Sequence, residues 1–250
     1  MKIAIVTGGS RGLGRNTALS LARKGVDVIL TYRERANDAA SAVREIEQLG
    51  RKALGLQLDT GKVGTFDAFV GEVKLALRKT WDRDRFDFVV NNAGVGISAS
   101  FAETTEAQFD ELMNVHLKGV YFLTQKLLPL IAEGGRIVNL SSSLTRFSLP
   151  SYSAYAMMQG AVEVLTRYLA KELGARQIAV NTVAPGAIET DFGGGRVRDN
   201  PEFNKFIASQ TALGRAGLPD DVGPAIASLL SDDNRWVNAQ RIEVSGGQWI

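Results

Sequence analysis

Seven short apolar runs recur along the chain, and stretches with helical periodicity separate most of them. The runs are KIAIVT, VDVILT, ALGLQL, FDFVVN, GRIVNL, IAVNTV and QRIEVS. Continuous apolar runs of this length are typical of parallel strands that are buried on both faces. Strand and helix in alternation predict a doubly wound α/β fold, in which helices cover both faces of a seven-stranded, mostly parallel sheet.

Glycines divide this pattern into elements. Gly25, Gly50 and Gly174 each follow an expected helix and are suited to be its C-cap. Residues 186–217 are irregular and rich in glycine, and a loop at this place overhangs the carboxyl edge of such a sheet, where ligands bind. No linker or internal repeat interrupts the sequence, so we expect a single domain over residues 1–250.

Composition excludes several classes of protein. The 29 basic and 27 acidic residues nearly cancel and form no basic run, which argues against a nucleic-acid or membrane-surface partner. The chain has no cysteine, hence no disulfide framework and no thiolate metal site, and no ligand cluster predicts a metal. No apolar run reaches membrane-spanning length, and MKIAIVTGG is too short for a signal peptide. A soluble cytoplasmic protein is therefore expected.

The first strand runs into the turn TGGSRGLG, which opens the first helix. Gly8, Gly12 and Gly14 allow a tight turn and a close approach of backbone to a pyrophosphate. The free N–H groups and the dipole of the helix N-terminus attract that anion. Because the turn lies between a strand and a helix in the first βα unit, it predicts nucleotide binding.

The glycine spacing, with Thr7 in front, resembles that of the short-chain dehydrogenase/reductase family, in particular its 3-oxoacyl-[acyl-carrier-protein] reductase-like members. Further motifs of that family follow in order: NNAG at 91–94, MNVHLKG, NLSSS, a tyrosine in YAMMQ, PGAIET at 185–190 and VSGG at 244–247. The resemblance covers nearly the whole chain. It implies a nicotinamide cofactor and a homotetramer or homodimer, with helices near 105–130 and 152–174 at the interface.

The family resemblance, together with the glycine turn, gives the expected cofactor contacts. They are Gly8, Ser10, Arg11, Gly12, Leu13, Gly14, Arg33, Asp59, Asn91, Ala93, Gly94, Tyr155, Gln159, Pro185, Gly186, Ile188 and Thr190.

Charge at the end of the second strand indicates which nicotinamide cofactor is bound. A site for NAD commonly presents a carboxylate there, whereas the 2′-phosphate of NADP requires a cation. In ILTYRER the expected acid is replaced by Tyr32, followed by Arg33, and Arg11 in the glycine turn supplies a second guanidinium. Arginine suits bidentate contacts to phosphate, so the sequence favours NADP(H).

The resemblance assigns the chemistry to Tyr155 as acid/base, Ser142 as hydrogen-bond donor to the substrate carbonyl oxygen, and Asn114 as holder of a water in a proton relay. Reduction of a ketone by hydride builds negative charge on oxygen, so a proton donor and an oxyanion partner are required. An apolar substrate pocket is expected from Ser142, Leu144, Phe147 and Phe192, although ordinary loop packing explains the last three equally well.

One position departs from the family pattern, which has lysine four residues after the tyrosine, where this chain has Gln159. The lysine donates to the nicotinamide ribose, and its charge lowers the tyrosine pKa, by about 1–3 units for a nearby opposite charge. Glutamine still donates through its NH₂ but carries no charge. Arg146 and Lys118 are the other cations that the sequence leaves open as substitutes.

Three explanations of Gln159 compete: an engineered replacement in a competent reductase, a natural residue in a protein that binds cofactor without reacting, or a tyrosine that works slowly without help. Because every other motif is intact, we favour a single replacement, natural or designed. His116, the only histidine, lies two residues after Asn114; α-helical geometry turns it away from that side chain and predicts a packing or surface residue.

The sequence thus predicts an NADPH-dependent reductase that converts a ketone to an alcohol, impaired by Gln159. Candidate substrates are 3-oxoacyl thioesters, sugars, steroids and small ketones. The alternative is a non-catalytic NADP(H)-binding or regulatory protein.

Overall fold

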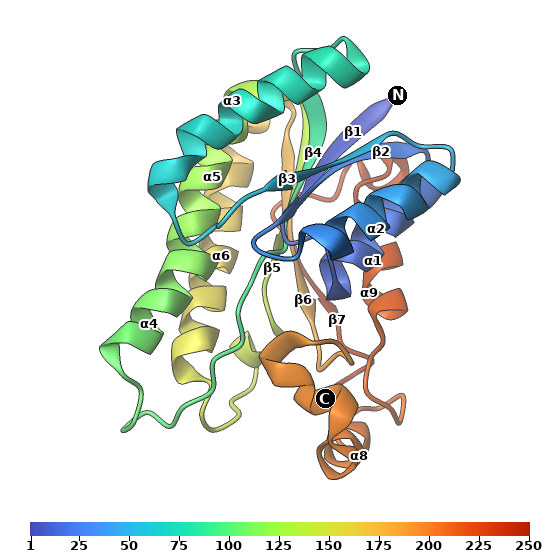
Figure 1. Ribbon diagram of the computed structural model, residues 1–250. Coiled ribbons are helices and arrows are strands. Elements are labelled where there is room, and N and C mark those ends of the chain that lie inside the picture. Colours follow the sequence, from blue (N-terminus) through green and yellow to red (C-terminus); the bar gives the residue numbers. More distant parts are fainter.

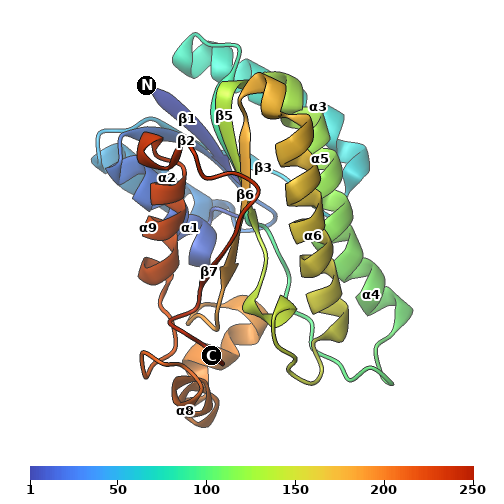
Figure 2. The ribbon, with the colours of Figure 1, turned by 180° about the vertical axis from the view of Figure 1, so that it is seen from behind.

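The seven predicted strands form one parallel sheet in the computed structural model, which describes residues 1–250. Their order in the sheet is β3-β2-β1-β4-β5-β6-β7 (Figures 1 and 2). The bounds are β1 Lys2–Val6, β2 Val26–Tyr32, β3 Ala53–Gln57, β4 Phe86–Asn91, β5 Ile131–Leu140, β6 Ala179–Pro185 and β7 Arg241–Val244. The doubly wound α/β prediction is confirmed.

Helices cover both faces of the sheet, as Figures 1 and 2 show from opposite sides. One face carries α1 (Gly12–Arg23), α2 (Ala36–Gln48) and α9 (Pro219–Leu229), and the other carries α3 (Phe66–Ala76), α4 (Glu106–Met113), α5 (Gly119–Leu127) and α6 (Ser153–Glu172). The short helices α7 (Arg196–Asp199) and α8 (Pro201–Ser209) follow β6 and lie beyond the carboxyl ends of the strands.

Two hydrophobic cores result from the alternation of side chains along each strand. In β1, Ile3 and Ile5 belong to the core under α3, α5 and α6, whereas Ala4 and Val6 belong to the core under α1, α2 and α9. Both sets are fully buried, because successive side chains of a strand point to opposite faces and both faces are covered. This is why the strand sequences are apolar throughout.

The helix ends follow the predicted glycines at two of three places. Gly25 and Gly50, just after α1 and α2, have φ of 84° and 75°, a left-handed conformation that glycine adopts without strain. After α6 the prediction was wrong, because Gly174 instead begins a 3₁₀ turn that runs to Arg176. The left-handed residue there is Gln177, whose N–H donates to the Gly174 carbonyl.

The long helix expected near 105–130 is interrupted by a wider, π-helical turn. This turn, Asn114–Lys118, joins α4 to α5. Gly119 follows it, and a Cβ atom there would lie 2.2 Å from the Thr60 carbonyl oxygen, so only glycine permits this approach of helix and loop. Single π turns inside helices are frequent at functional sites.

A chain of buried polar side chains connects the sheet to α6. Asn91 of β4 donates to Asn139 of β5 (2.8 Å), and Asn139 donates to the Thr166 hydroxyl of α6 (2.9 Å). Thr182 of β6 donates to the same hydroxyl (2.7 Å). All four residues are buried, so these directional contacts fix α6, and the residues it carries, relative to the strand ends.

None of the helices is both long and apolar enough to cross a membrane.

Replacement of Asn139 tests this connection. Asn139→Ala removes the donor to Thr166 and leaves the buried Asn91 amide with one partner fewer, so we expect a loss of about 2–4 kcal/mol in the free energy of unfolding. Urea denaturation measures it, with Asn37→Ala on the exposed side of α2 as the control, expected to change stability by less than about 0.5 kcal/mol. Equal effects of the two substitutions would contradict the proposed anchoring.

Candidate functional site

A cavity of about 580 Å³ lies at the carboxyl edge of the sheet. It extends from the turn between β1 and α1, past the ends of β4 and β5, to the segment that follows β6. The chain runs from β1 outward to β3 on one side and from β4 outward to β7 on the other, and in open α/β sheets ligands bind where the winding divides in this way.

The cavity brings together all the residues predicted for cofactor or substrate contact. They are Gly8, Ser10, Arg11, Gly12, Leu13, Gly14, Arg33, Asp59, Asn91, Ala93, Gly94, Ser142, Leu144, Phe147, Tyr155, Gln159, Pro185, Gly186, Ile188, Thr190 and Phe192. Of the predicted site residues, only Asn114 is not part of its lining. No cluster of three or more histidine, aspartate or glutamate side chains suited to a metal ion occurs in the chain.

The glycine turn is packed too closely for any other residue at Gly14. A Cβ atom there would lie 2.2 Å from the Gly8 carbonyl oxygen and 2.4 Å from the Asn92 side chain. The Thr7 hydroxyl accepts from the N–H groups of Asn92 (2.9 Å) and Ala93 (3.0 Å), which ties the turn to the end of β4. No side chain caps the first turn of α1, so its N–H groups are available to an anion such as a phosphate.

Cationic side chains line the cavity near the end of β2. Arg33 and Arg35 follow Tyr32, and each pairs with an acidic neighbour in its own segment. Arg11 of the glycine turn reaches Asp191 at 3.2 Å. These pairs are exposed and weak, so a phosphate could compete for the guanidinium groups. No carboxylate takes the place of Tyr32 at the end of β2.

Ser142 and Tyr155 form the polar centre of the cavity. Ser142 follows β5, and its Oγ accepts from the Leu144 N–H (3.2 Å), so its own hydroxyl proton is free to be donated. Tyr155 lies in the first turn of α6. Burial raises the pKa of Tyr155 to about 12, and the side chains of Ser142 and Gln159 offset part of this rise. The phenol is therefore protonated at physiological pH.

No ammonium or guanidinium lies beside Gln159. The residue is buried, its Nε2 is 3.1 Å from His116 Nδ1, and its Oε1 has no hydrogen-bond partner. Neither of the two substitute cations lines the cavity: Lys118 is exposed, and Arg146 is bound elsewhere. The polar centre of the cavity is thus built from neutral groups.

His116 is a packing residue, which is one of the two predicted alternatives, but the sequence analysis missed that it lines the cavity. The imidazole is buried, lines the cavity and meets the Tyr155 ring edge-on at 5.1 Å between centroids. Burial lowers the pKa of His116 to about 4, against which a hydrogen bond to Val95 acts only weakly. His116 lies in the π-helical turn Asn114–Lys118, and the extra residue of such a turn changes which side chains face the cavity.

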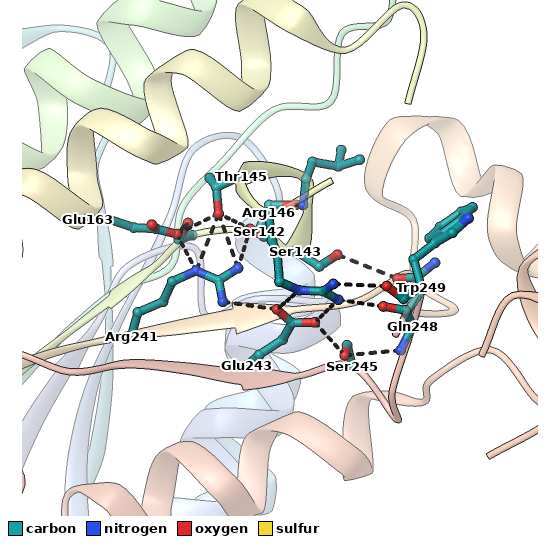
Figure 3. A network of polar contacts seen from close by, with 12 residues as sticks. Ser142, Ser143, Thr145, Arg146, Glu163, Arg241, Glu243, Ser245, Gln248 and Trp249 are labelled. Carbon is teal, nitrogen blue, oxygen red and sulfur yellow. Dashed lines mark hydrogen bonds and ion pairs between the residues drawn. The ribbon is translucent and has the colours of Figure 1, made fainter. Parts of the chain in front are cut away.

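Arg146 belongs to a network that holds the carboxyl-terminal residues against the site (Figure 3). Its guanidinium donates to Glu243 of β7 (2.7 and 2.8 Å) and to the carbonyls of Gln248 (2.5 Å) and Trp249 (2.9 Å). Burial acts to raise the pKa of Glu243, but hydrogen bonds from Arg146, Ser245 and Arg241 outweigh it and bring the pKa to about 2.

A second guanidinium in Figure 3 supports the turn that carries Ser142. Arg241 pairs with Glu163 of α6 at 2.8 Å and donates to the Ser142 carbonyl at 3.3 Å. The Thr145 hydroxyl also donates to Glu163 (2.8 Å). Strand β7 and helix α6 therefore jointly fix the position of Ser142.

Aromatic side chains form the wall of the cavity opposite the glycine turn. Besides the predicted Phe147 and Phe192, the sequence analysis missed Tyr152, Phe203 and Trp249. The rings of Phe147 and Trp249 lie 4.4 Å apart between centroids. Trp249 is next to last in the sequence, and no local pattern places it here, because contacts with distant residues return that segment to the site: Arg146 donates to the Trp249 carbonyl, and the Trp249 N–H donates to the Gln210 carbonyl.

Three comparisons place these features among known proteins. Residues 8–248 match the family described as enoyl-(acyl carrier protein) reductase. The tetrahydroxynaphthalene reductase PfmaG of Pestalotiopsis fici is 32% identical over 257 residues, which cover 98% of this chain and 91% of that protein.

Two solved structures are similar over essentially the full length. The promiscuous reductase LugOII, which catalyses keto-reduction at C1 during lugdunomycin biosynthesis, superposes with a TM-score of 0.94 at 35% identity, covering 100% of this chain and 98% of that one. The angucycline C-6 ketoreductase LanV with bound NADP also gives 0.94, at 33% identity and with 99% and 95% covered.

Burial of a neutral histidine makes the stability of the fold depend on pH. The imidazole pKa is 6.5 in the unfolded chain and about 4 in the folded one, so below 6.5 the unfolded state binds more protons and is favoured. We expect His116 to lower the free energy of unfolding by about 3 kcal/mol as the pH falls from about 7 to about 4. Urea denaturation at several pH values measures this.

The matched control is His116→Asn, which lacks the titrating group but retains all the carboxylates. The difference in stability between the two proteins isolates the histidine. A difference that stays constant across this pH range would show that His116 does not titrate as a buried neutral group.

Proposed function

The chain belongs to the short-chain dehydrogenase/reductase family, and from that premise we propose that it is an NADPH-dependent reductase of an aromatic ketone. One observation carries the proposal: Ser142 and Tyr155 converge in the cavity that also contains the glycine turn. The relatives support it, since a tetrahydroxynaphthalene reductase and an NADP-bound ketoreductase are among them.

The residues present fit the cofactor. The close packing at Gly14 and the uncapped N-terminus of α1 suit a pyrophosphate, and Arg11 and Arg33 suit a 2′-phosphate. The buried Gln159 Oε1 lacks a partner and is suited to accept from a ribose hydroxyl. When bound, NADPH supplies the hydride.

Tyr155 is the acid in the proposed reaction and Ser142 orients the ketone. The Ser142 hydroxyl donates to the carbonyl oxygen, and the phenol of Tyr155 gives its proton to the same oxygen as negative charge develops there. With a pKa of about 12 the phenol is always protonated at neutral pH but is a weak acid. The reaction is therefore slower than with a cation beside the tyrosine, which is the impairment expected from Gln159.

The proposed substrate is an aromatic ketone rather than a sugar or an acyl thioester. Five aromatic side chains supply flat apolar surface: Phe147, Tyr152, Phe192, Phe203 and Trp249. Stacking of rings adds to the free energy of burial. The names of the relatives agree, because tetrahydroxynaphthalene and angucycline ketones are the substrates that they indicate.

Assembly and compartment stay predictions: a homotetramer or dimer from the family resemblance, and the cytoplasm from the composition of the chain. Tyr121 on α5 and Val164 and Tyr168 on α6 are exposed, and they offer an apolar surface to a second copy. Light scattering would size the assembly.

Restoring a cation tests the role of Gln159. We expect Gln159→Lys to raise turnover by about 10- to 1,000-fold, because the charge lowers the pKa of Tyr155 and strengthens it as an acid. NADPH consumption over a panel of aromatic and aliphatic ketones measures this, with Gln48→Lys on the exposed surface of α2 as the control. If the lysine variant is inert on the whole panel while both proteins bind NADPH, the non-catalytic alternative is favoured.

Cofactor choice has a separate test. Arg33→Ala removes a guanidinium that contacts the 2′-phosphate in our proposal, so we expect NADPH binding to weaken about 10- to 100-fold while NADH binding changes little. Fluorescence titration measures both dissociation constants, and Arg44→Ala on α2 is the control for loss of surface charge. An equal loss of affinity for the two cofactors would disprove this phosphate contact.

A further inference from the structure

Two buried polar side chains meet beside Tyr155 from segments far apart in the sequence. Gln159 comes from α6 and His116 from the π-helical turn, with 3.1 Å between Gln159 Nε2 and His116 Nδ1. The other ring nitrogen, His116 Nε2, lies 2.7 Å from the carbonyl oxygen of Val95, in the loop after β4. The imidazole therefore bridges that loop to the catalytic helix.

The two contacts of the ring define where its proton lies. A neutral imidazole has one donor and one acceptor nitrogen. At 2.7 Å from the Val95 oxygen, Nε2 must carry the hydrogen, since two lone pairs would otherwise face each other. The Val95 N–H, 3.1 Å from the same nitrogen, is the longer of the two contacts and cannot be accepted at the same time. Nδ1 is then the acceptor and takes a hydrogen from the Gln159 amide.

This arrangement orients the amide of Gln159. If the NH₂ group donates to His116, Oε1 is directed away from the imidazole, and it has no partner in the protein although it is buried. An unpartnered buried acceptor is unfavourable unless a ligand donates to it. Gln159 lines the cavity, so that ligand is expected there.

We propose that His116 is a positioning residue, which holds the Gln159 amide so that Oε1 accepts a hydrogen bond from a ribose hydroxyl of the nicotinamide cofactor. This rests on the proposed NADP(H) binding. His116 and Gln159 together then replace an ammonium group in orienting the cofactor but not in charge. Of the two functions of a lysine at this position, the pair supplies ribose binding, and it gives the tyrosine a neutral hydrogen bond but no charge.

The surroundings of the pair agree with a positioning role. Gly94 packs on the imidazole so closely that a Cβ atom there would lie 2.7 Å from His116 Cε1, which restricts ring rotation. No charged side chain acts on the pKa of Tyr155, so no charge competes for the amide. The NH₂ group of Gln159 has two hydrogens, and a hydrogen bond from Gln159 also acts to lower the pKa of Tyr155, so His116 Nδ1 and the phenol together orient the amide.

Two substitutions of similar size separate positioning from packing. His116→Asn retains an acceptor near the place of Nδ1 and loses the contact to Val95, whereas His116→Gln retains a polar group near the place of Nε2 and loses the acceptor. We expect the asparagine variant to bind NADPH within about 3-fold of the parent and the glutamine variant to bind it about 5- to 15-fold more weakly, the effect of one hydrogen bond. Fluorescence titration with NADPH measures this.

A double-substitution cycle is the second part of this test. Gln159→Met removes the amide, and if His116 acts only through it, His116→Gln combined with Gln159→Met binds NADPH as weakly as Gln159→Met alone. Additive losses would overturn the proposal, as would a greater loss in the asparagine variant than in the glutamine variant. Circular dichroism and thermal unfolding establish that each variant is folded.

Nitrogen NMR reads the proton position directly, because His116 is the only histidine. At neutral pH we expect a neutral ring with the hydrogen on Nε2, and a hydrogen on Nδ1 or a charged ring would overturn the proposal. None of these readouts depends on turnover. If no ketone is reduced while the double-substitution cycle and the NMR agree with expectation, the reductase proposal fails and the positioning role stands. If a ketone is reduced but the losses in the cycle are additive, the positioning role fails and the reductase proposal stands.

Discussion

Parallel pairing of β1 with both β2 and β4 is the constraint on which the site depends. The direction of winding reverses between β1 and β4, so the loops that follow these two strands diverge and leave a cavity at the carboxyl edge of the sheet. The Thr7 hydroxyl joins the two loops by accepting from the backbone of Asn92 and Ala93. The glycine turn, the end of β4 and the residues after β5 and β6 are thereby fixed around one space.

Within this space the chemistry relies on neutral hydrogen bonds. Burial without a nearby cation keeps the phenol of Tyr155 protonated and the imidazole of His116 uncharged. The charged groups that support the site, Arg146 and Arg241 with their glutamates, lie behind the Ser142 turn and act on its position. Around Ser142 and Tyr155, charged groups therefore hold the backbone while the side chains that face the cavity are uncharged; the arginines that line the cavity lie in the glycine turn, after β2 and in α7.

Strands could be predicted from sequence because they depend on a local pattern, and most cavity-lining residues were expected from the family resemblance, whose motifs lie at strand ends. Burial on two faces requires continuous apolar runs, and a parallel sheet places every strand end at one edge, so motifs at strand ends meet. The role of Asn114 stays a prediction from the family resemblance, and the helix that carries it contains a π turn, which the sequence does not reveal. Trp249 was missed because its place depends on Arg146, more than a hundred residues earlier in the chain.

By itself, the sequence determined the doubly wound sheet and the glycine turn, since both follow from residue types and their spacing, and the family resemblance marked Gln159 as the position where a lysine is expected. Only the tertiary structure decided what Gln159 contacts. Its partner His116 is 43 residues away in the sequence, and the two meet because helix and turn pack on the same strand ends. A hydrogen bond between distant residues depends on atomic positions of a few tenths of an ångström, and packing rather than sequence pattern fixes these.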